Sequence, residues 1–552
     1  METTTTASGS LLLAALVALP LLGALLLAFI PKEQQTAHRA IGTVIASLVF
    51  LLSIPLVTGF DPNNPGFQFA FDAAWIDSVG ATASIGVDGI SLWIIMLTTF
   101  LTPLILIGAY QAVDKRVREF VIAMLVLESA MIGALVARDL LLFYLFWEMM
   151  LVPMYLLIGI WGGKDRLYAT IKFVIYTIVG SLLMLVGVVY LYIQTGEQGG
   201  AATFAYDAIV ALDLTETEQL WLFAAFGLAF LIKVPLFPFH TWLPDAHTQA
   251  PTAGSVVLAG VLLKMGTYGL LRFALPLFPE AMGAFSPAIL ILSVIGIVYG
   301  ALVAFAQGDV KKLVAYSSVS HLGFVMLGIV ALNQQSVEGS ILQMINHGIS
   351  TGALFMLVGI IYERRHTRRI KDFGGIGAVM PVFTVLFLIV TMSSIGLPGT
   401  NGFAGEFLIL SGAFLDALPV LPGTGIGDWP MLAAIMAVVA TTGVVLGAIY
   451  MLSMVRRVFF GPLTHEENKE LKDMTMRERI TLAPMIAGIF VIGLFPTLLT
   501  SYTTASVAKL VGEVRPRVQL VRNTRAMRDA ADREAEDDLI RVAAPRAASV
   551  EE

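Results

Sequence analysis

The chain has 552 residues, of which 57% are hydrophobic and only 13% are charged. Soluble domains carry about 25% charged residues, so this composition excludes a water-soluble globule and indicates a polytopic membrane protein. The sequence has no cysteine, which excludes thiolate-bound iron–sulfur clusters, cysteine zinc sites and disulfides, and its net charge of -6 provides no basic stripe for nucleic acid.

Apolar segments follow one another from the N-terminus to residue 504. A helix needs about 20 apolar residues to cross the hydrocarbon core of a bilayer. The segments that meet this requirement are 10–30, 41–59, 89–110, 118–137, 140–161, 169–194, 219–248, 252–275, 286–306, 312–332, 336–362, 381–415, 430–455 and 480–504. The sequence therefore predicts an all-α polytopic membrane protein with about 14 transmembrane helices.

Lys and Arg gather in the loops that follow the odd-numbered segments. These loops hold 20 basic residues, whereas the loops after the even-numbered segments hold 2 and are rich in Asp and Glu. Basic loops of membrane proteins face the cytoplasm. With an even number of spans, we expect both termini outside the cytoplasm. We also expect a bacterial inner membrane, because no organelle presequence is present.

The composition changes sharply after residue 505. The stretch 514–552 carries charges of both signs among many alanines. This composition is compatible with a surface helix or with a disordered tail, and we favour an interfacial helix over about 503–514 and weak order beyond it.

Six ionisable residues fall at similar depth within different apolar segments: Glu148, Lys233, Lys264, His321, His347 and Glu406. A charged side chain at the bilayer centre costs at least about 2.5–3.5 kcal/mol on insertion scales. Such groups persist when they pair with one another or line a water path. Simple helix-to-helix pairing is one interpretation, but the common depth of all six favours a path for protons or ions.

Proline and glycine interrupt two of the predicted spans. Pro235 and Pro238 lie in the seventh span, and Pro398 and Gly399 lie in the twelfth. Interior proline removes a backbone hydrogen bond, and broken helices in corresponding places of two halves are typical of ion paths. The alternative is that proline and glycine are simply common in membrane helices.

The two interrupted spans are five apart, and a repeat with an odd number of helices must be inverted in the membrane. We therefore predict that spans 4–8 and spans 9–13 form two inverted five-helix repeats, with Lys233 beside the first break corresponding to Glu406 beside the second. The predicted parts are the three N-terminal spans (1–117), the first half-channel (118–275), the second half-channel (286–460), the last span with its preceding loop (461–505) and an amphipathic, charged C-terminal tail (506–552).

In this interpretation, Glu148 and Lys233 form a switchable pair. Burial disfavours a charged ammonium group and a nearby carboxylate favours it, so loss of the carboxylate's influence would release a proton. Lys264, His321 and His347 would then relay protons towards Glu406.

Several stretches make the chain similar to a known family: FWEMMLVPMY (146–155), HTWLPDAHTQAPTAGSVVLAG (240–260), YSSVSHLGF (316–324), HGISTGALF (347–355) and GLPGTNGFAGEF (396–407). Over residues 1 to about 512, the chain resembles the antiporter-like membrane chains of proton-pumping NADH–quinone oxidoreductase, respiratory complex I. The same superfamily contains cation/proton antiporter subunits and hydrogenase membrane chains.

The resemblance implies roles for the same residues. Glu148 would modulate Lys233, Lys264 would connect two half-channels, and His321 and His347 would belong to a central hydrophilic axis. Among the antiporter-like chains of this family, the broken twelfth span carries Lys in chains L and N but Glu in chain M. Glu406 therefore favours a resemblance to chain M. The tail beyond about residue 515 departs from the family pattern.

The resemblance also implies proton translocation driven by NADH oxidation in other subunits. Flavin, iron–sulfur clusters and quinone are expected in those partner subunits, and this chain is expected to hold no cofactor and no metal. The expected partners are other membrane subunits, especially two neighbouring antiporter-like chains, together with the lipid bilayer and protons, but no nucleic acid. Two alternatives are a subunit of a multi-chain cation/proton antiporter and a passive scaffold.

Overall fold

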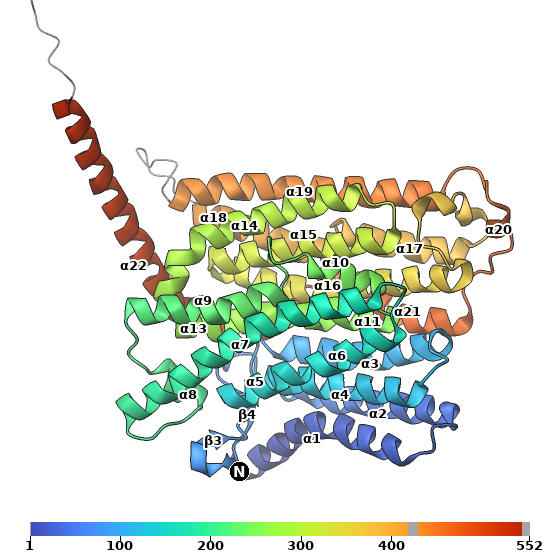
Figure 1. Cartoon of the computed structure of the whole chain (residues 1–552), viewed down its shortest axis with the longest axis horizontal. Coiled ribbons are helices and arrows are strands. Elements are labelled where there is room, and N and C mark those ends of the chain that lie inside the picture. The colour runs from blue at the N-terminus through green and yellow to red at the C-terminus, as the bar shows by residue number, and fades with distance from the viewer. Residues whose placement is uncertain (1, 418–428, 544–552) are drawn as a thin grey trace, which may run out of the picture.

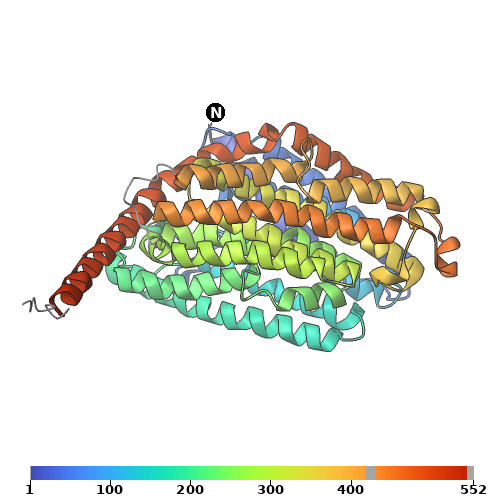
Figure 2. The ribbon, with the colours of Figure 1, turned by 90° about the horizontal axis from the view of Figure 1, so that it is seen from above.

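The computed structural model describes residues 2–417 and 429–543, and this part of the chain is almost entirely helical (Figure 1). The helices run roughly along the long axis of the molecule, so their loops gather at two opposite ends (Figures 1 and 2). The short helices α20 (Glu466–Lys469) and α8 (Tyr206–Val210) mark these ends. We name the end with α20, where the Lys- and Arg-rich loops lie, the basic face, and the end with α8 the acidic face.

The N-terminal half of the bundle is built from α1 (Glu2–Phe29), α2 (Gln35–Thr58), α3 (Leu92–Ala112), α4 (Val117–Val136), α5 (Leu140–Met149), α6 (Leu151–Trp161), α7 (Arg166–Gly199), α9 (Glu216–Lys233) and α10 (Trp242–Gln249). The next span contains α11 (Thr252–Val257), a π-helical turn (Leu258–Leu262), α12 (Leu263–Gly269), a second π-helical turn (Leu270–Ala274) and α13 (Leu275–Leu277).

The C-terminal half contains α14 (Pro279–Phe305), α15 (Val310–Ala331), α16 (Gln334–Arg365), α17 (Pro381–Ser394), α18 (Asn401–Ala417), α19 (Trp429–Phe459), α21 (Met476–Leu494) and α22 (Thr497–Ala543). Three short 3₁₀ turns complete the helical elements: Asp77–Val79, Ile370–Asp372 and Ile376–Ala378.

The described residues form 11 helical segments that are long and apolar enough to cross a membrane, or 12 if the bent pair α21 and α22 is one span. The two remaining predicted spans, 219–248 and 381–415, are each formed by two shorter helices. Every predicted segment therefore coincides with a helix or a helix pair. The all-α polytopic fold is confirmed, and the number of spans depends on how the broken pairs are counted.

Four short strands on the acidic face are an addition to the all-α prediction. β1 (Gln68–Phe71) pairs antiparallel with β4 (Ile85–Val87), and β2 (Ala74–Ile76) pairs antiparallel with β3 (Ala81–Thr82). Gly80, between them, has a positive φ of 63°. A left-handed residue of this kind permits a tight return of the chain, and glycine adopts it without strain.

The C-terminal prediction of weak order beyond about residue 514 is wrong for the part of the tail that packs on the bundle, as far as Arg522. α22 continues from Thr497 to Ala543 without interruption, and its last part projects away from the bundle (Figure 1). Val514 and Val518 are buried, and Arg522 donates hydrogen bonds to the Ser286 hydroxyl and the Val330 carbonyl at 2.9 and 3.0 Å. Packing therefore extends the helix past the predicted end, and alanine and arginine favour its continuation.

Two spans lie at the centre of the bundle. The segments Thr252–Leu277 and Gln334–Arg365 are buried along their whole apolar windows, unlike the outer helices α1, α2 and α19. A Cβ atom on Gly348 would lie 2.9 Å from the Gly260 carbonyl oxygen and 2.5 Å from Leu97. Glycine at this position therefore allows the two central spans to approach closely, as small residues do between membrane helices.

Spans five and ten begin with the same local structure on opposite faces. Asp139 caps α5 by accepting hydrogen bonds from two backbone amides, and Asp309 caps α15 in the same way. Each aspartate also forms an isolated antiparallel bridge, Asp139 with Ala205 and Asp309 with Arg369. Asp139 lies at the acidic face and Asp309 at the basic face.

Candidate functional site

The two broken spans have the same backbone pattern at their interruptions. In the first, the Leu236 amide donates to the Leu231 carbonyl at 2.9 Å. In the second, the Leu397 amide donates to the Met392 carbonyl at 3.0 Å. Both bonds span five residues. Each is followed by a hydrogen bond that spans three residues, from the Phe239 amide to the Leu236 carbonyl and from the Thr400 amide to the Leu397 carbonyl. The four predicted helix-breaking residues all lie in these interruptions: Pro235, Pro238, Pro398 and Gly399.

Aligning the two breaks on these hydrogen bonds changes the expected correspondence between charged residues. Lys233 is the last residue of α9 and precedes its break, whereas Glu406 lies in α18 beyond its break. The position that matches Glu406 is Asp245 of α10, which forms an ion pair with Lys172 of α7 at 2.7 Å. Lys233 instead matches Ser394. The two ionisable residues therefore occupy different positions in their broken spans.

Glu406 is held by direct contacts in the second half. Its side chain is 5% exposed, and its Oε1 accepts a hydrogen bond from the Gln343 amide at 3.1 Å. The same oxygen lies 3.0 Å from His321 Nδ1. Burial of a carboxylate is costly unless it is hydrogen-bonded or paired, and both neighbours meet that requirement.

Lys264 is joined to this cluster through a second histidine. Its side chain is fully buried, and its Nζ lies 2.7 Å from His347 Nδ1 and contacts the Ala259 carbonyl oxygen. The rings of His347 and His321 are 5.8 Å apart between centroids. One buried row of ionisable groups on four different helices thus runs from Lys264 through His347 and His321 to Glu406.

A small polar cavity lies beside the two histidines of this row. It offers about 10 Å³ and is lined by His321, Gln343, Asn346, His347, Ser350, Thr351, Ser393, Ser394 and Gly402. A water molecule needs about 10–15 Å³ and two to four polar partners. The cavity therefore suits a single water between groups that exchange protons.

Lys233 is surrounded differently. It is 2% exposed, and its Nζ lies 5.1 Å from the centre of the Trp147 ring and 5.9 Å from that of Phe173. Glu148, next to Trp147 on α5, is half-buried and interacts with Lys233 electrostatically. The two residues form no direct ion pair in the described part of the chain. Aromatic faces therefore supply the nearest stabilisation of the ammonium group.

The site contains polar residues that the sequence analysis did not single out. Asn401 begins α18, and its amide oxygen accepts from Ser350 at 3.2 Å and from Ser393. His247 is fully buried at the end of α10 and stacks on Phe355, with 4.6 Å between ring centroids. The hydrophobic pattern gives no signal for Asn401. His247 carries a weak signal, because it is an ionisable residue at the end of an apolar segment.

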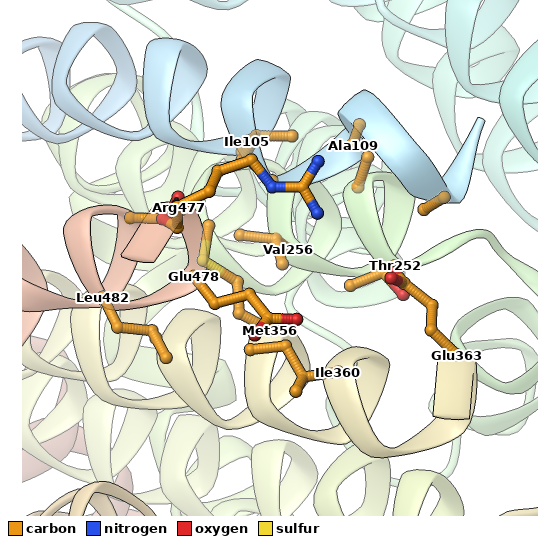
Figure 3. A pocket seen from close by; sticks show the side chains of 14 residues that line it. Ile105, Ala109, Thr252, Val256, Met356, Ile360, Glu363, Arg477, Glu478 and Leu482 are labelled. Atoms are coloured by element: carbon orange, nitrogen blue, oxygen red, sulfur yellow. Dashed lines mark hydrogen bonds between the residues drawn. The ribbon is translucent and has the colours of Figure 1, made fainter. Parts of the chain in front are cut away.

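A separate cavity near the basic face lies between α3, α11, α16 and α21 (Figure 3). It offers about 40 Å³, and apolar residues such as Val256 and Met356 form much of its wall. Its polar groups are Glu363, Arg477 and Glu478, and Glu478 also accepts from Arg364 at 2.8 Å. None of the six predicted site residues lines this cavity.

Within residues 2–417 and 429–543, no group of three or more His, Asp or Glu side chains is arranged to hold a metal ion. The ionisable groups of the site form a linear row rather than a ligand cluster. This geometry suits transfer of protons between neighbouring groups.

Comparison with protein families places these features in a known context. Residues 137–427 match the model of the transmembrane region described as NADH:quinone oxidoreductase/Mrp antiporter. NADH-quinone oxidoreductase subunit M of Rhodobacter capsulatus is 48% identical over 511 residues, which cover 91% of this chain and 96% of that protein. NADH-ubiquinone oxidoreductase chain 4 of Marchantia polymorpha is 40% identical, with 90% and 97% covered.

Solved structures agree with this relationship. A chain of respiratory complex I from Thermus thermophilus is 32% identical, with a TM-score of 0.78, and the match covers 90% of this chain and 99% of that chain. A chain of the Mrp complex from Dietzia sp. shares the fold at 20% identity, with a TM-score of 0.77 and coverage of 93% and 99%. The chain belongs to the NADH:quinone oxidoreductase/Mrp antiporter family of multi-pass, proton-translocating membrane subunits.

Proposed function

We propose that this chain is a subunit of an NADH–quinone oxidoreductase and moves protons along a path that includes Glu148, Lys233, Lys264, His347, His321 and Glu406. The observation that carries the proposal is the buried row from Lys264 to Glu406, in which titratable groups of four helices contact one another or share a water-sized cavity. Titratable groups inside a membrane protein that pair in this way are typical of proton relays.

In this proposal, two inverted half-channels, 118–275 and 286–460, follow the three N-terminal spans (1–117). The matched breaks and the aspartate caps at opposite faces support the inversion. The last span with its preceding loop (461–505) and the charged C-terminal tail (506–552) follow the second half-channel.

The first half begins with Glu148 and Lys233. When the carboxylate acts on Lys233, the ammonium form is favoured, and when that influence weakens the proton is released. Gly266 fits closely against the Phe230 carbonyl oxygen, because a Cβ there would lie 2.6 Å from it. The helix that carries Lys264 therefore touches the end of the helix that carries Lys233, and the proton passes on towards His347.

The energy comes from NADH oxidation by quinone in partner subunits, which would also hold the flavin and the iron–sulfur clusters. The names of the relatives support this assignment, and their high coverage extends it to nearly the whole chain. Two neighbouring antiporter-like chains are the proposed partners within the membrane. The basic face is proposed to lie in the cytoplasm of a bacterial cell, with both termini outside.

Purification of the chain from its native membrane tests the assembly. Flavin absorbance, iron–sulfur absorbance and NADH–quinone activity are expected in the same peak as this chain. Co-purification of small hydrophobic chains alone, with sodium-dependent exchange in the absence of NADH, would instead establish the antiporter alternative.

The variant Lys233→Met tests the path. In the assembled complex, reconstituted into vesicles, we expect NADH oxidation to transport fewer protons per electron than in the wild type. Lys233→Arg keeps a cation against Trp147 but cannot release its proton, so it should lose as much transport as Lys233→Met. An unchanged proton-to-electron ratio in Lys233→Met would remove Lys233 from the mechanism.

A further inference from the structure

A buried ion pair lies outside the row of proposed proton carriers. Arg272, in the second π-helical turn, contacts Asp88, which precedes α3. The two side chains are only 8% and 5% exposed. Replacement of a buried ion pair by apolar residues is often neutral or stabilising, so stability alone does not account for this pair.

The pair borders a cavity of about 500 Å³ at the acidic face. Six charged residues of both signs line it: Asp88, Arg138, Asp207, Arg272, Lys509 and Glu513. A cavity of this size and polarity holds many water molecules, because each needs only about 10–15 Å³ and a few polar partners. Water from the acidic face therefore reaches Arg272 and Asp88.

The same residues separate this water from Lys264. Arg272 follows Lys264 by eight residues, or about 12 Å along a helix. Tyr268 lies between them, 1% exposed, with its hydroxyl donating to the Leu135 carbonyl at 3.0 Å. The Arg272 guanidinium lies 5.8 Å from the centre of the Tyr268 ring. Lys264 itself contacts Ala259 and His347, and Ala259 lies in the direction opposite to Arg272 along the span.

Neither member of the pair is suited to pass a proton inwards. A guanidinium group has five N–H donors and no acceptor, and it stays charged in proteins. Both oxygens of Asp88 already have partners, because Oδ1 accepts hydrogen bonds from the Ile90 and Ser91 amides at 3.1 Å and Oδ2 faces Arg272. A hydronium ion in the cavity therefore meets a fixed positive charge and an occupied carboxylate.

We propose that Arg272 and Asp88 form a proton-tight floor that closes the first half-channel against the acidic face. This inference rests on the proposed function, because a floor is needed only if Lys264 carries protons. Without it, protons already moved to the acidic face would return to Lys264 through the cavity. The pair thus prevents a leak rather than carrying protons itself.

The test measures passive proton leak with the assembled complex in lipid vesicles, without NADH, after an imposed pH difference and with an internal pH dye. We expect Arg272→Gln to raise the leak about tenfold, equivalent to about 1.4 kcal/mol of barrier, because it removes the fixed positive charge and leaves Asp88 free to accept a proton. Arg272→Lys keeps the charge and should stay near the wild type. Arg138→Gln, which alters another cation of the same cavity, is the matched control.

Two double variants keep the proposal open to refutation. If Arg272→Gln does not assemble, Asp88→Asn with Arg272→Gln removes both charges and should still raise the leak, because the fixed positive charge that repels hydronium is lost. Arg272→Gln with Lys264→Met should return the leak to the wild-type rate, because the leak passes through Lys264. An unchanged leak in Arg272→Gln or in the Asp88 double variant, or one that persists without Lys264, would overturn the floor.

Failure of the proposed function has a different signature. In that case, Lys264→Met alone would leave NADH-driven proton transport unchanged, whatever the leak measurements give.

Discussion

The two broken spans hold their ionisable residues in different ways. Lys233 ends the first helix of its pair and faces the rings of Trp147 and Phe173. Glu406 lies beyond its break, where Gln343 and His321 contact it directly. An aromatic face attracts a cation but exchanges no proton with it. A histidine, in contrast, gives a proton to a neighbouring carboxylate or takes one from it. The first half therefore isolates Lys233 from other titratable groups, whereas the second half connects Glu406 to its titratable neighbours.

The largest expected effect comes from the residue that links the two halves. Lys264→Met removes the ammonium group that contacts His347, so we expect NADH-driven proton transport to fall about tenfold or more. Loss of a hydrogen bond to a charged group costs about 1.5–3 kcal/mol, and 1.4 kcal/mol is a factor of ten. The measurement is the proton-to-electron ratio in vesicles. Lys469→Met, in an exposed pair with Glu466, is the control. Equal ratios for both variants would separate Lys264 from transport.

The connected half is tested next by Glu406→Gln. The amide keeps an acceptor oxygen for Gln343 but cannot take up a proton, so transport should fall about tenfold while the complex assembles normally. Glu406→Asp should retain more transport. Glu338→Gln changes a half-buried carboxylate of α16 outside the row and serves as the control. Full transport by Glu406→Gln would show that its contacts are structural only.

The isolated half is tested by Trp147→Leu. A cation–π interaction is worth about 0.5–2 kcal/mol, so loss of the indole should destabilise charged Lys233 and lower transport about fivefold, equivalent to about 1 kcal/mol. Trp147→Phe keeps a ring face and should lie between the variant and the wild type. The measurement is the initial rate of acidification of the vesicles on addition of NADH. Identical rates for the Leu and Phe variants would contradict a role for the ring.

The smallest effect is expected from Glu148→Gln. Glu148 acts on Lys233 through space rather than through a direct ion pair, and such longer interactions are weaker. We expect about a threefold decrease in the transport rate. Glu119→Gln, a half-buried carboxylate in the first turn of α4 beside Arg118, is the matched control. A loss as large as that of Lys264→Met would mean that the first half is as tightly connected as the second.

Much of the site was predictable because burial of charge in a membrane is costly enough to be visible in the sequence. Lys264, His321, His347 and Glu406 stand out as ionisable residues in apolar segments, and the structure brings them together. The breaks were predictable for a similar reason, since proline removes a backbone hydrogen bond wherever it occurs. Asn401 and Ser393 carry no such signal, because hydroxyl and amide groups are common at helix ends.

Other features depended on packing that a linear pattern does not contain. The charged composition of α22 suggested weak order, but Val514, Val518 and Arg522 find partners on distant helices. The ion pair of Arg272 and Asp88 joins residues far apart in the chain, at the edge of a cavity formed by loops and α22.

The sequence by itself determined the membrane-spanning helices, the two faces of opposite charge and the residues that carry protons in the proposed path. These follow from the local balance of apolar and charged residues, which sets the cost of insertion into lipid. Only the tertiary structure decided which charges touch. Contacts between helices depend on crossing geometry and on small residues such as Gly348, so Lys264 meets His347, while Lys233 meets aromatic rings.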